Sequence, residues 1–306
     1  MLVLIVGISG NLGLKLADAL IRRGHQVRGA SRSKSSIPES DLARLESFHQ
    51  TKTWYDTETL RQAVRGVDTV VCTYAPLPYL ALEAELLLVR IMEEEGVTRF
   101  VPSAWNMDWS QLQWGQVPYY DVFLALKRQL ELSSTVKPLY IFVGMLCEVF
   151  FSVPGHGHFV PENKGVWNPA SKSALVWGSG HEKWQMTTEH DTAEFTAEVI
   201  QDMSNETGIY RFCSFEKSTR EMAEAYEKAR GVRVTIDTAG SLDELKVAAA
   251  NAVEQVGPQR YWEWMGYFYQ IYQLDGTFHM RKLDNDRYTA VNTTSMERVL
   301  ELNPEI

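Results

Sequence analysis

Apolar and polar positions follow two different periods along the first half of the chain. Residues 2–6 (Leu-Val-Leu-Ile-Val) are an unbroken apolar run, which is typical of a parallel strand buried on both faces. Apolar residues at helical spacing continue to residue 23, and a second strand is expected over residues 25–30. The order strand, helix, strand predicts a doubly wound parallel sheet of the Rossmann type.

The same alternation continues to residue 143. It predicts strands over 68–73, 99–103 and 138–143 and helices over 57–65, 80–95 and 123–133. The second half is mixed: it predicts helices over 192–203, 218–230 and 242–256, a short strand over 232–236 and a loop-rich segment over 164–177. We therefore expect a Rossmann-type domain in residues 1–153, completed by parts of 185–205. Residues 154–306 are expected to form a smaller mixed α/β part that binds the substrate.

The first strand leads into a glycine-rich turn. Gly7, Gly10 and Gly13 recur at every third position, with Ser9, Asn11 and Leu12 between them. Glycines at this spacing let the backbone turn tightly and approach a pyrophosphate at the helix N-terminus. The strand before the turn and the helix after it are the context that this motif requires. The turn therefore predicts a dinucleotide site, and Ala75 and Ser103 complete the set of residues assigned to it.

The end of the second strand bears on which dinucleotide is bound. An NAD site places an acid here for the ribose 2′-hydroxyl, whereas this chain reads Ala-Ser-Arg-Ser-Lys over residues 30–34. Arg32 offers a planar fork for a 2′-phosphate, and Lys34 adds a second charge. The alternative is a solvated basic loop without a ligand. We read this segment as favouring NADP(H) over NAD(H).

Composition narrows the function classes. The chain has 306 residues, of which 45% are hydrophobic and 23% charged, enough for one large domain or two modest ones. A net charge of −9 without a basic stripe argues against nucleic acid as a general partner. The apolar stretch over residues 139–153 is too short to span a bilayer and contains Glu148, and the N-terminal run is too short for a signal sequence. We expect a cytoplasmic protein, monomeric or homodimeric.

The three cysteines do not indicate a metal or redox site. Cys72, Cys147 and Cys213 lie far apart in apolar surroundings, without metal-like or redox-pair spacing. They are expected to be buried thiols in a reducing compartment. His156 and His158 form a His-x-His pair, but no cysteine or acidic ligand set accompanies it, so we expect a loop that borders the substrate and no metal.

Several segments together resemble a known family. They are the glycine turn, the run Gly-Val-Thr-Arg-Phe-Val-Pro-Ser over residues 96–103, residues 187–193 ahead of a helix, and Leu-Asp-Asn-Asp-Arg-Tyr over 283–288. The chain resembles the NmrA-like and isoflavone-reductase-like branch of the atypical short-chain dehydrogenases, and its C-terminal segment looks like the fungal members. The resemblance implies NADP(H) in the Rossmann half and a variable small-molecule pocket between the halves. Family members include reductases of secondary metabolites and redox-sensing regulators that do not turn over a substrate.

The sequence also departs from the family pattern. Family reductases usually follow Pro-Ser with Glu-Phe-Gly or Glu-Trp-Gly, where this chain has Ala-Trp-Asn over residues 104–106. Aligning Lys127 to Glu131 with the end of the family's catalytic helix places Phe123 at the position of the usual catalytic lysine. Lys127 is the obvious substitute, but it lies one helical turn further on and would reach a different level of the pocket.

Three interpretations of Phe123 remain open, besides an alignment that is off by a few residues. An iminium substrate already carries a positive charge and accepts hydride without an acid. A cyclase or isomerase could bind the dinucleotide only as a structural part of the pocket and use other acids. A regulator needs no catalytic group.

Aromatic residues cluster after the fifth predicted strand, where an open α/β sheet holds its substrate. The residues assigned to substrate binding are Trp105, Trp109, Tyr120, Phe123, Phe150 and His158. An apolar, aromatic wall suits a flat ring system. Asp108, whose pKa burial could raise, and Tyr119 are the candidate proton donors, with Lys127 as a third catalytic candidate.

These features together predict an NADPH-dependent reductase. Its substrate is expected to be a small aromatic biosynthetic intermediate of secondary metabolism, reduced at a C=N or conjugated C=C bond. The alternatives are a non-redox cyclase or isomerase in the same pocket and a dinucleotide-sensing regulator without catalysis.

Overall fold

The computed structural model describes residues 1–75 and 77–306. The chain divides into two compact units, each built from three segments. Unit 1 comprises residues 1–105, 120–142 and 192–210, and unit 2 comprises residues 106–119, 143–191 and 211–306. The chain therefore leaves the first unit three times and returns to it twice. The expected division near residue 153 stays a prediction about folding domains.

A seven-stranded sheet forms the centre of unit 1. Its strand order is β11-β6-β5-β4-β1-β2-β3. The strands are β1 (Leu2–Val6), β2 (Gln26–Ser31), β3 (Ser47–Gln50), β4 (Thr69–Cys72), β5 (Arg99–Val101), β6 (Lys137–Phe142) and β11 (Gly208–Arg211). The pairs from β3 across to β6 are all parallel. The Rossmann-type doubly wound fold is confirmed, and the order reverses between β1 and β4, where such sheets bind ligands.

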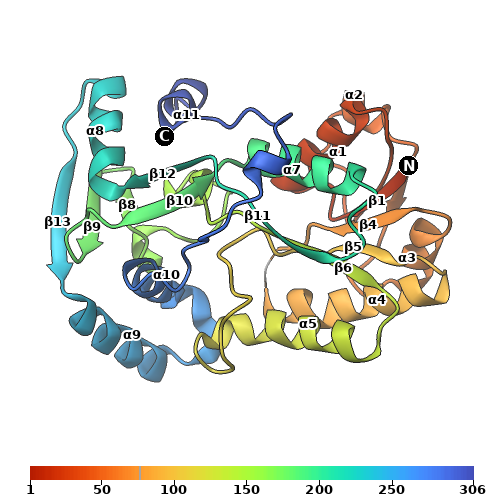
Figure 1. Cartoon of the computed structure of the whole chain (residues 1–306), viewed down its shortest axis with the longest axis horizontal. Coiled ribbons are helices and arrows are strands. Elements are labelled where there is room, and N and C mark those ends of the chain that lie inside the picture. Colours follow the sequence, from red (N-terminus) through yellow and green to blue (C-terminus); the bar gives the residue numbers. More distant parts are fainter. Residues whose placement is uncertain (76) are drawn as a thin grey trace. The chain divides into compact units, whose positions relative to one another are not determined.

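Helices cover both faces of this sheet. Figure 1 shows α3, α4 and α5 along one face and α1 and α7 along the other. The helices are α1 (Asn11–Arg22), α2 (Glu39–Leu42), α3 (Thr57–Val64), α4 (Glu85–Glu94), α5 (Asp121–Ser133) and α7 (Glu189–Gln201). Asp56 caps α3 by accepting a hydrogen bond from the Thr59 backbone N–H, and Gly66 leaves that helix with a φ of +73°.

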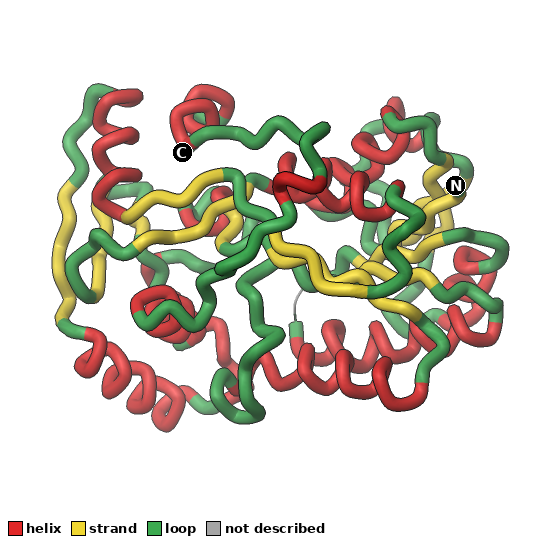
Figure 2. Tube along the Cα trace, viewed as in Figure 1, coloured by secondary structure: helices red, strands yellow, loops and turns green. Residues whose placement is uncertain are grey.

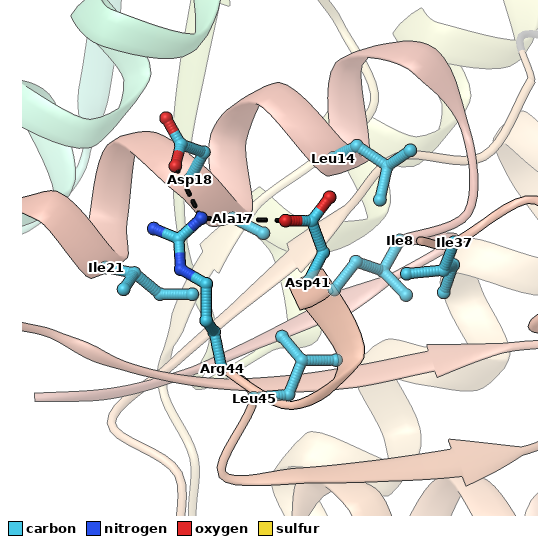
Figure 3. Close-up of a pocket in the computed structure, with 9 residues that line it drawn as sticks. All are labelled: Ile8, Leu14, Ala17, Asp18, Ile21, Ile37, Asp41, Arg44 and Leu45. Carbon is cyan, nitrogen blue, oxygen red and sulfur yellow. Dashed lines mark ion pairs between the residues drawn. The ribbon is translucent and has the colours of Figure 1, made fainter. Parts of the chain in front are cut away.

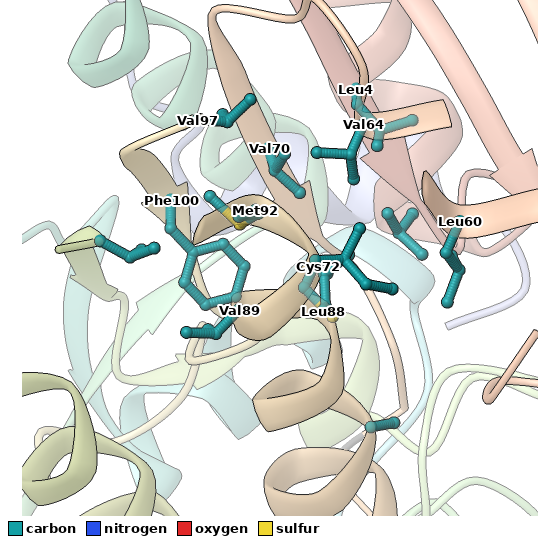
Figure 4. Close-up of a cluster of buried hydrophobic side chains, with 14 of the residues drawn as sticks. Leu4, Leu60, Val64, Val70, Cys72, Leu88, Val89, Met92, Val97 and Phe100 are labelled. Atoms are coloured by element: carbon teal, nitrogen blue, oxygen red, sulfur yellow. The ribbon is translucent and has the colours of Figure 1, made fainter. Parts of the chain in front are cut away.

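The core under α3 and α4 is apolar and closely packed. Phe100 of β5 and Val70 of β4 meet Leu88 and Met92 of α4, and all four are fully buried (Figure 4). Cys72 lies in the same cluster. Each buried side chain of this size stabilises the fold by roughly 1.5–3 kcal/mol, and the sum fixes the strand ends that carry the candidate site.

Unit 2 contains two three-stranded sheets, ordered β12-β10-β7 and β13-β9-β8. Its strands are β7 (Met145–Leu146), β8 (Trp167–Asn168), β9 (Ser173–Trp177), β10 (Lys183–Thr187), β12 (Phe215–Ser218) and β13 (Thr235–Gly240). Its helices, shown red in Figure 2, are α6 (Cys147–Phe150), α8 (Thr219–Arg230), α9 (Leu242–Val256), α10 (Met265–Leu274) and α11 (Met296–Leu302). Ser218 and Ser241 begin α8 and α9 with capping boxes, which explains why both helices were readable from the sequence.

Three expected elements differ from the structure. The strand expected over 232–236 is β13, Thr235–Gly240, because Gly231 ends α8 in the left-handed region and the next residues carry the chain to its pairing partner β9. The segment 164–177 contains β8 and β9, which pair with each other, and β9 also pairs with β13, which lies far along the chain. The helix expected over 80–95 begins with a π-helical turn, Leu80–Ala84, before α4. Strands β3, β7, β10, β11 and β12 were not anticipated.

All three cysteines are free and buried, as expected. Among the residues that the structure describes, no helix is long and apolar enough to cross a membrane.

Candidate dinucleotide site and its surroundings

The glycine turn has the backbone geometry that the motif predicts. Gly7 has a φ of +87°, and a Cβ there would lie 3.0 Å from the carbonyl oxygen of Thr73, the residue after β4. A Cβ on Gly13 would lie 2.8 Å from the Cα of Ile8, so only glycine lets α1 pack this closely on the turn. Gly10 has an ordinary φ of −81°, and a Cβ there meets its nearest atom at 3.4 Å. Gly7 and Gly13 are therefore required by the fold, whereas Gly10 keeps the exposed surface of the turn flat.

The N-terminus of α1 is suited to an anion. Gly10 is its N-cap and has no side chain to cap the helix, and the first turn holds no acidic residue. The first N–H groups of a helix have no intrahelical acceptor and carry partial positive charge. Ser9 is half-buried beside this turn, while Gly10 and Asn11 are exposed. The surface that they form can accept a pyrophosphate without rearrangement of the backbone.

The basic segment after β2 is held by an aromatic ring that the sequence analysis missed. The guanidinium carbon of Arg32 lies 3.7 Å from the centroid of the Trp54 ring, a cation–π arrangement. Trp54 follows β3, a strand that was not anticipated, so its proximity to Arg32 was not predictable from the pattern. The stacked guanidinium is exposed and has its donors in a fixed plane.

Serine hydroxyls connect the basic segment to the glycine turn. Ser31 donates a hydrogen bond to the carbonyl oxygen of Ser33 at 2.7 Å, and Ser36 donates one to the carbonyl oxygen of Ser9 at 3.1 Å. The structure therefore brings Arg32 and Lys34 into the same unit and to the same edge of the sheet as the glycine turn. Lys34 is exposed.

The crevice behind the glycine turn is not a ligand site. It lies between α1 and α2, where Arg44 forms ion pairs with Asp18 at 2.8 Å and with Asp41 at 3.6 Å (Figure 3). Its free volume is about 10 Å³, which is close to the space of one water molecule. The exposed side of the turn is the candidate dinucleotide surface.

Ala75 and Ser103 lie after neighbouring strands of the sheet. Ala75 is exposed after β4, and Ser103 is 9% exposed after β5. The hydroxyl of Ser103 donates a hydrogen bond to the carbonyl oxygen of Tyr74 at 2.7 Å, which joins the two strand ends. These are the carboxyl ends next to the point where the strand order reverses.

A buried acid that the sequence analysis did not single out lies beneath these strand ends. Glu85, at the start of α4, is fully buried, and neither carboxyl oxygen has a partner in hydrogen-bond geometry among residues 1–75 and 77–306. Burial raises the pKa of Glu85 well above its usual range, although the backbone of Ser103 and the thiol of Cys72 oppose the shift. Glu85 follows directly on the π-helical turn, a local irregularity that is frequent near functional sites.

The helix that carries Phe123 also carries Lys127, and the catalytic role expected for Lys127 stays a prediction. Phe123 is 2% exposed and packs beside Tyr120, which is fully buried, with ring centroids 5.5 Å apart. Lys127 forms an ion pair with Glu131 on the same helix. In the same unit, the indole N–H of Trp105 donates to the hydroxyl of Thr196 at 2.8 Å.

Asp108 belongs to unit 2, where its carboxylate is held by a cation. One oxygen accepts a hydrogen bond from the Arg211 guanidinium at 2.6 Å, and the other accepts from the Ser110 backbone N–H and hydroxyl at 3.0 and 2.6 Å. Asp108 is 9% exposed. The hydrogen bond from Arg211 and the two from Ser110 fix the position of the carboxyl group. Its role as an acid stays a prediction.

Tyr119 is also in unit 2 and lies in a cluster of tyrosines. Its ring stacks on Tyr261 with centroids 4.3 Å apart, and only 5% of the residue is exposed. Burial, with smaller contributions from Tyr269 and Tyr261, raises the pKa of Tyr119 well above its usual value. The phenol stays neutral and gives up its proton reluctantly.

Other residues assigned to the substrate wall fall into the core of unit 2. Trp109 is 1% exposed, and Phe150 is fully buried against Phe151 and Trp184. His158 is exposed. The neighbouring His156 pairs through Nδ1 with the buried Glu189 at 2.8 Å, and the described residues contain no group that could hold a metal ion. The structure thus divides the assigned substrate residues between the two units.

The fold and the glycine turn define a Rossmann-type dinucleotide-binding protein. The model of the NmrA-like family matches residues 1–292, and the chain belongs to this family. A bifunctional pinoresinol-lariciresinol reductase of Linum perenne is 26% identical over 99% of this chain and 94% of its own, and an isoflavone reductase homolog of Lupinus albus is 25% identical over 98% of each.

Solved structures share the fold. A structure of AtPrR2 with NADP+ and (+)-pinoresinol has a TM-score of 0.75 at 20% identity and covers 98% of this chain and 97% of its own. The binary complex of leucoanthocyanidin reductase and NADPH from Vitis vinifera has a TM-score of 0.76 at 17% identity and covers 99% of both chains. The resemblance stated from the sequence motifs is thereby confirmed at the level of family and fold.

Proposed function

We propose that the protein is an NADPH-dependent reductase of a small aromatic intermediate in secondary metabolism. The observation that carries this is the joint placement, in one unit, of an uncapped α1 N-terminus and the stacked Arg32 guanidinium. The first is suited to a pyrophosphate and the second to a 2′-phosphate. Relatives named for reductases, and solved structures named as NADP+ and NADPH complexes, support the same cofactor. We place its activity in the cytoplasm.

The residues available for proton transfer favour a C=N bond as the acceptor. Asp108 is paired with Arg211, burial raises the pKa of Tyr119, and Lys127 is paired with Glu131. A carbonyl or enone needs a proton as the hydride arrives, and a positioned acid typically contributes 10²–10⁴-fold. An iminium carbon needs none, because hydride addition neutralises a charge that is already present. Bound NADPH would supply the hydride.

Phe123 is consistent with this acceptor. If it occupies the position of the family lysine, its buried phenyl ring replaces a cation that would repel an iminium ion. An aromatic face instead attracts a cation. A conjugated C=C bond remains the second choice, with Tyr119 as the donor.

The experiment is a binding and turnover series with the purified protein. Dissociation constants for NADPH, NADP+, NADH and NAD+ are measured by tryptophan fluorescence, and NADPH oxidation is then followed with cyclic aromatic imines and with matched enones. The proposal predicts tighter binding of NADPH than of NADH and oxidation with imines. Similar affinity for both oxidised dinucleotides, with weak binding of the reduced forms and no turnover, would identify a sensor. Rearrangement of a substrate without NADPH oxidation would identify a cyclase or isomerase.

A further inference from the structure

Unit 2 contains a cavity of its own that the proposed dinucleotide site does not use. Its volume is about 340 Å³, and every residue that lines it belongs to unit 2. It lies against β10 and β12, with the end of α10 and the turn over residues 275–279 as walls. A volume of this order matches the lower end of small-molecule sites.

Hydrogen bonds hold the walls of the cavity in place. The amide of Gln185 on β10 forms two bonds with the backbone of Met280, donating to its carbonyl oxygen at 3.1 Å and accepting from its N–H at 2.8 Å. Gln273 donates to the carbonyl oxygen of Lys183 at 3.0 Å. Both ends of the wall are thus tied to the same strand, so the cavity is preformed.

The lining is acidic. Glu182, Glu216 and Asp275 line it, and within the described part of the chain none of them has a basic group at ion-pair distance. Lys183 is also in the lining, but its ammonium group pairs with Glu221, which is not. His279 is a further lining residue, and Glu182 is half-buried whereas Glu216 and Asp275 are exposed.

Glu182 is the most constrained of the three. One of its oxygens accepts hydrogen bonds from the Ser179 backbone N–H and hydroxyl at 3.1 and 3.0 Å. The other, Oε2, is buried and has no hydrogen-bond partner among the described residues. Burial raises the pKa of Glu182, but hydrogen bonds from backbone N–H groups, including that of Ser179, outweigh it and lower the pKa. A buried acceptor that stays charged is costly unless a donor meets it.

Apolar side chains supply the remaining wall. Met107 and Phe278 are both buried, and Leu274 is half-buried beside them. A ligand that satisfies both surfaces carries a positive charge at one end and an apolar, preferably aromatic, body at the other. An anion would meet the three carboxylates, and a neutral ring would leave them without a counter-charge.

We propose that this cavity is a binding site for a small organic cation, a protonated amine or an iminium ion with an aromatic body. The proposal stands on the cavity and its charges and does not depend on the reductase activity. Two kinds of ligand have this combination of positive charge and aromatic body. One is the substrate or product of the proposed reaction, and the other is a separate effector amine.

The test uses tryptamine as the cationic probe and tryptophol as its neutral counterpart. Isothermal titration of the full-length protein without dinucleotide is expected to show one tryptamine site, with affinity at least about 10-fold higher than for tryptophol. Equal affinity for the two probes, or no saturable binding of tryptamine, would overturn the proposal. Because the comparison uses the wild-type protein, it does not depend on any variant folding.

Variants then locate the site. Glu182→Gln retains an acceptor for Ser179 and Asp275→Asn retains one for the Thr277 backbone N–H, and each is expected to weaken tryptamine binding about 3- to 10-fold without changing tryptophol binding. Glu224→Gln, an exposed carboxylate on α8 outside the cavity, is the matched control and is expected to change neither. Unchanged tryptamine binding in both cavity variants would place the amine elsewhere and overturn the assignment.

The outcome separates the two possible occupants and is independent of the proposed function. If NADPH oxidation with an imine falls in parallel with amine affinity in Glu182→Gln, the cavity holds the substrate. If turnover is retained while amine binding falls, the cavity holds an effector. Amine binding without any dinucleotide binding would support the cation site and refute the reductase. Dinucleotide binding and NADPH oxidation without amine binding would support the reductase and refute the cation site.

Discussion

The guanidinium of Arg32 lies flat over the indole of Trp54, with 3.7 Å between the guanidinium carbon and the ring centroid. The two residues come from the ends of adjacent parallel strands, β2 and the poorly patterned β3. Stacking leaves the edge of the guanidinium available for a planar anion such as a phosphate. The contact with Trp54 restricts the position of the Arg32 guanidinium, although Arg32 lies in an exposed loop.

Replacing Arg32 by serine is expected to weaken NADPH binding about 10- to 100-fold, because a charge-assisted bidentate contact contributes roughly 1.5–3 kcal/mol. Binding of NADH, which lacks the 2′-phosphate, should change less than about 3-fold. Fluorescence titration of both dinucleotides measures the ratio. Arg128→Ser, an exposed arginine on α5, is the control. Equal losses for NADPH and NADH would show that Arg32 does not read the 2′-phosphate.

Two glycines of the turn are expected to affect different properties, Gly13 the stability of the fold and Gly10 the affinity for NADPH. Gly13→Ala is expected to destabilise the protein by about 1–3 kcal/mol, because its Cβ would lie 2.8 Å from the backbone of Ile8. Gly10→Ala has an ordinary φ and a nearest contact of 3.4 Å, so it should fold normally but hinder the approach of a pyrophosphate. Urea unfolding and NADPH titration of both variants test this. Normal NADPH affinity in folded Gly10→Ala would argue against a pyrophosphate at this turn.

The buried Glu85 predicts a pH-dependent stability. Its folded-state pKa is raised by burial, so the neutral acid is the form that the fold accepts. The contribution of the neutral Glu85 to the free energy of unfolding is fully present below the ordinary glutamate pKa of about 4.3. It is lost as the pH rises toward the folded-state pKa. Glu85→Gln should therefore become increasingly more stable than the wild type between pH 5 and about pH 9. Urea unfolding across that range measures it, and a difference that does not change with pH would show that Glu85 is not a neutral buried acid.

Measuring stability and turnover separately tests whether Asp108 or Tyr119 transfers a proton. Asp108→Asn loses the charge of its pair with Arg211 and is expected to lower the free energy of unfolding by roughly 1–3 kcal/mol. With an imine substrate, kcat of the folded variant should change less than about 3-fold, and the same holds for Tyr119→Phe. A loss of kcat of about 10-fold or more at unchanged stability in either variant would assign proton transfer to that residue.

The local sequence of the N-terminal half determined most of its fold and of the dinucleotide site. Residues 2–6 must form a buried strand because they are apolar without interruption, and Gly7 and Gly13 are required by a positive φ and by a close approach that follow from the turn itself. Arg32 was identified because it directly follows β2, which pairs with β1 in the first strand–helix–strand segment. These features depend on neighbours within about thirty residues.

Tertiary structure alone decided the features that join distant segments. Trp54 under Arg32, Arg211 against Asp108 and Tyr261 against Tyr119 each pair residues whose separation no periodicity encodes. The unit 2 cavity arises where β10, β12 and the end of α10 meet, so its acidic lining is visible only once the chain is folded. The sequence determines which local conformations are favourable, whereas long-range packing determines which charges meet and which are left without a partner.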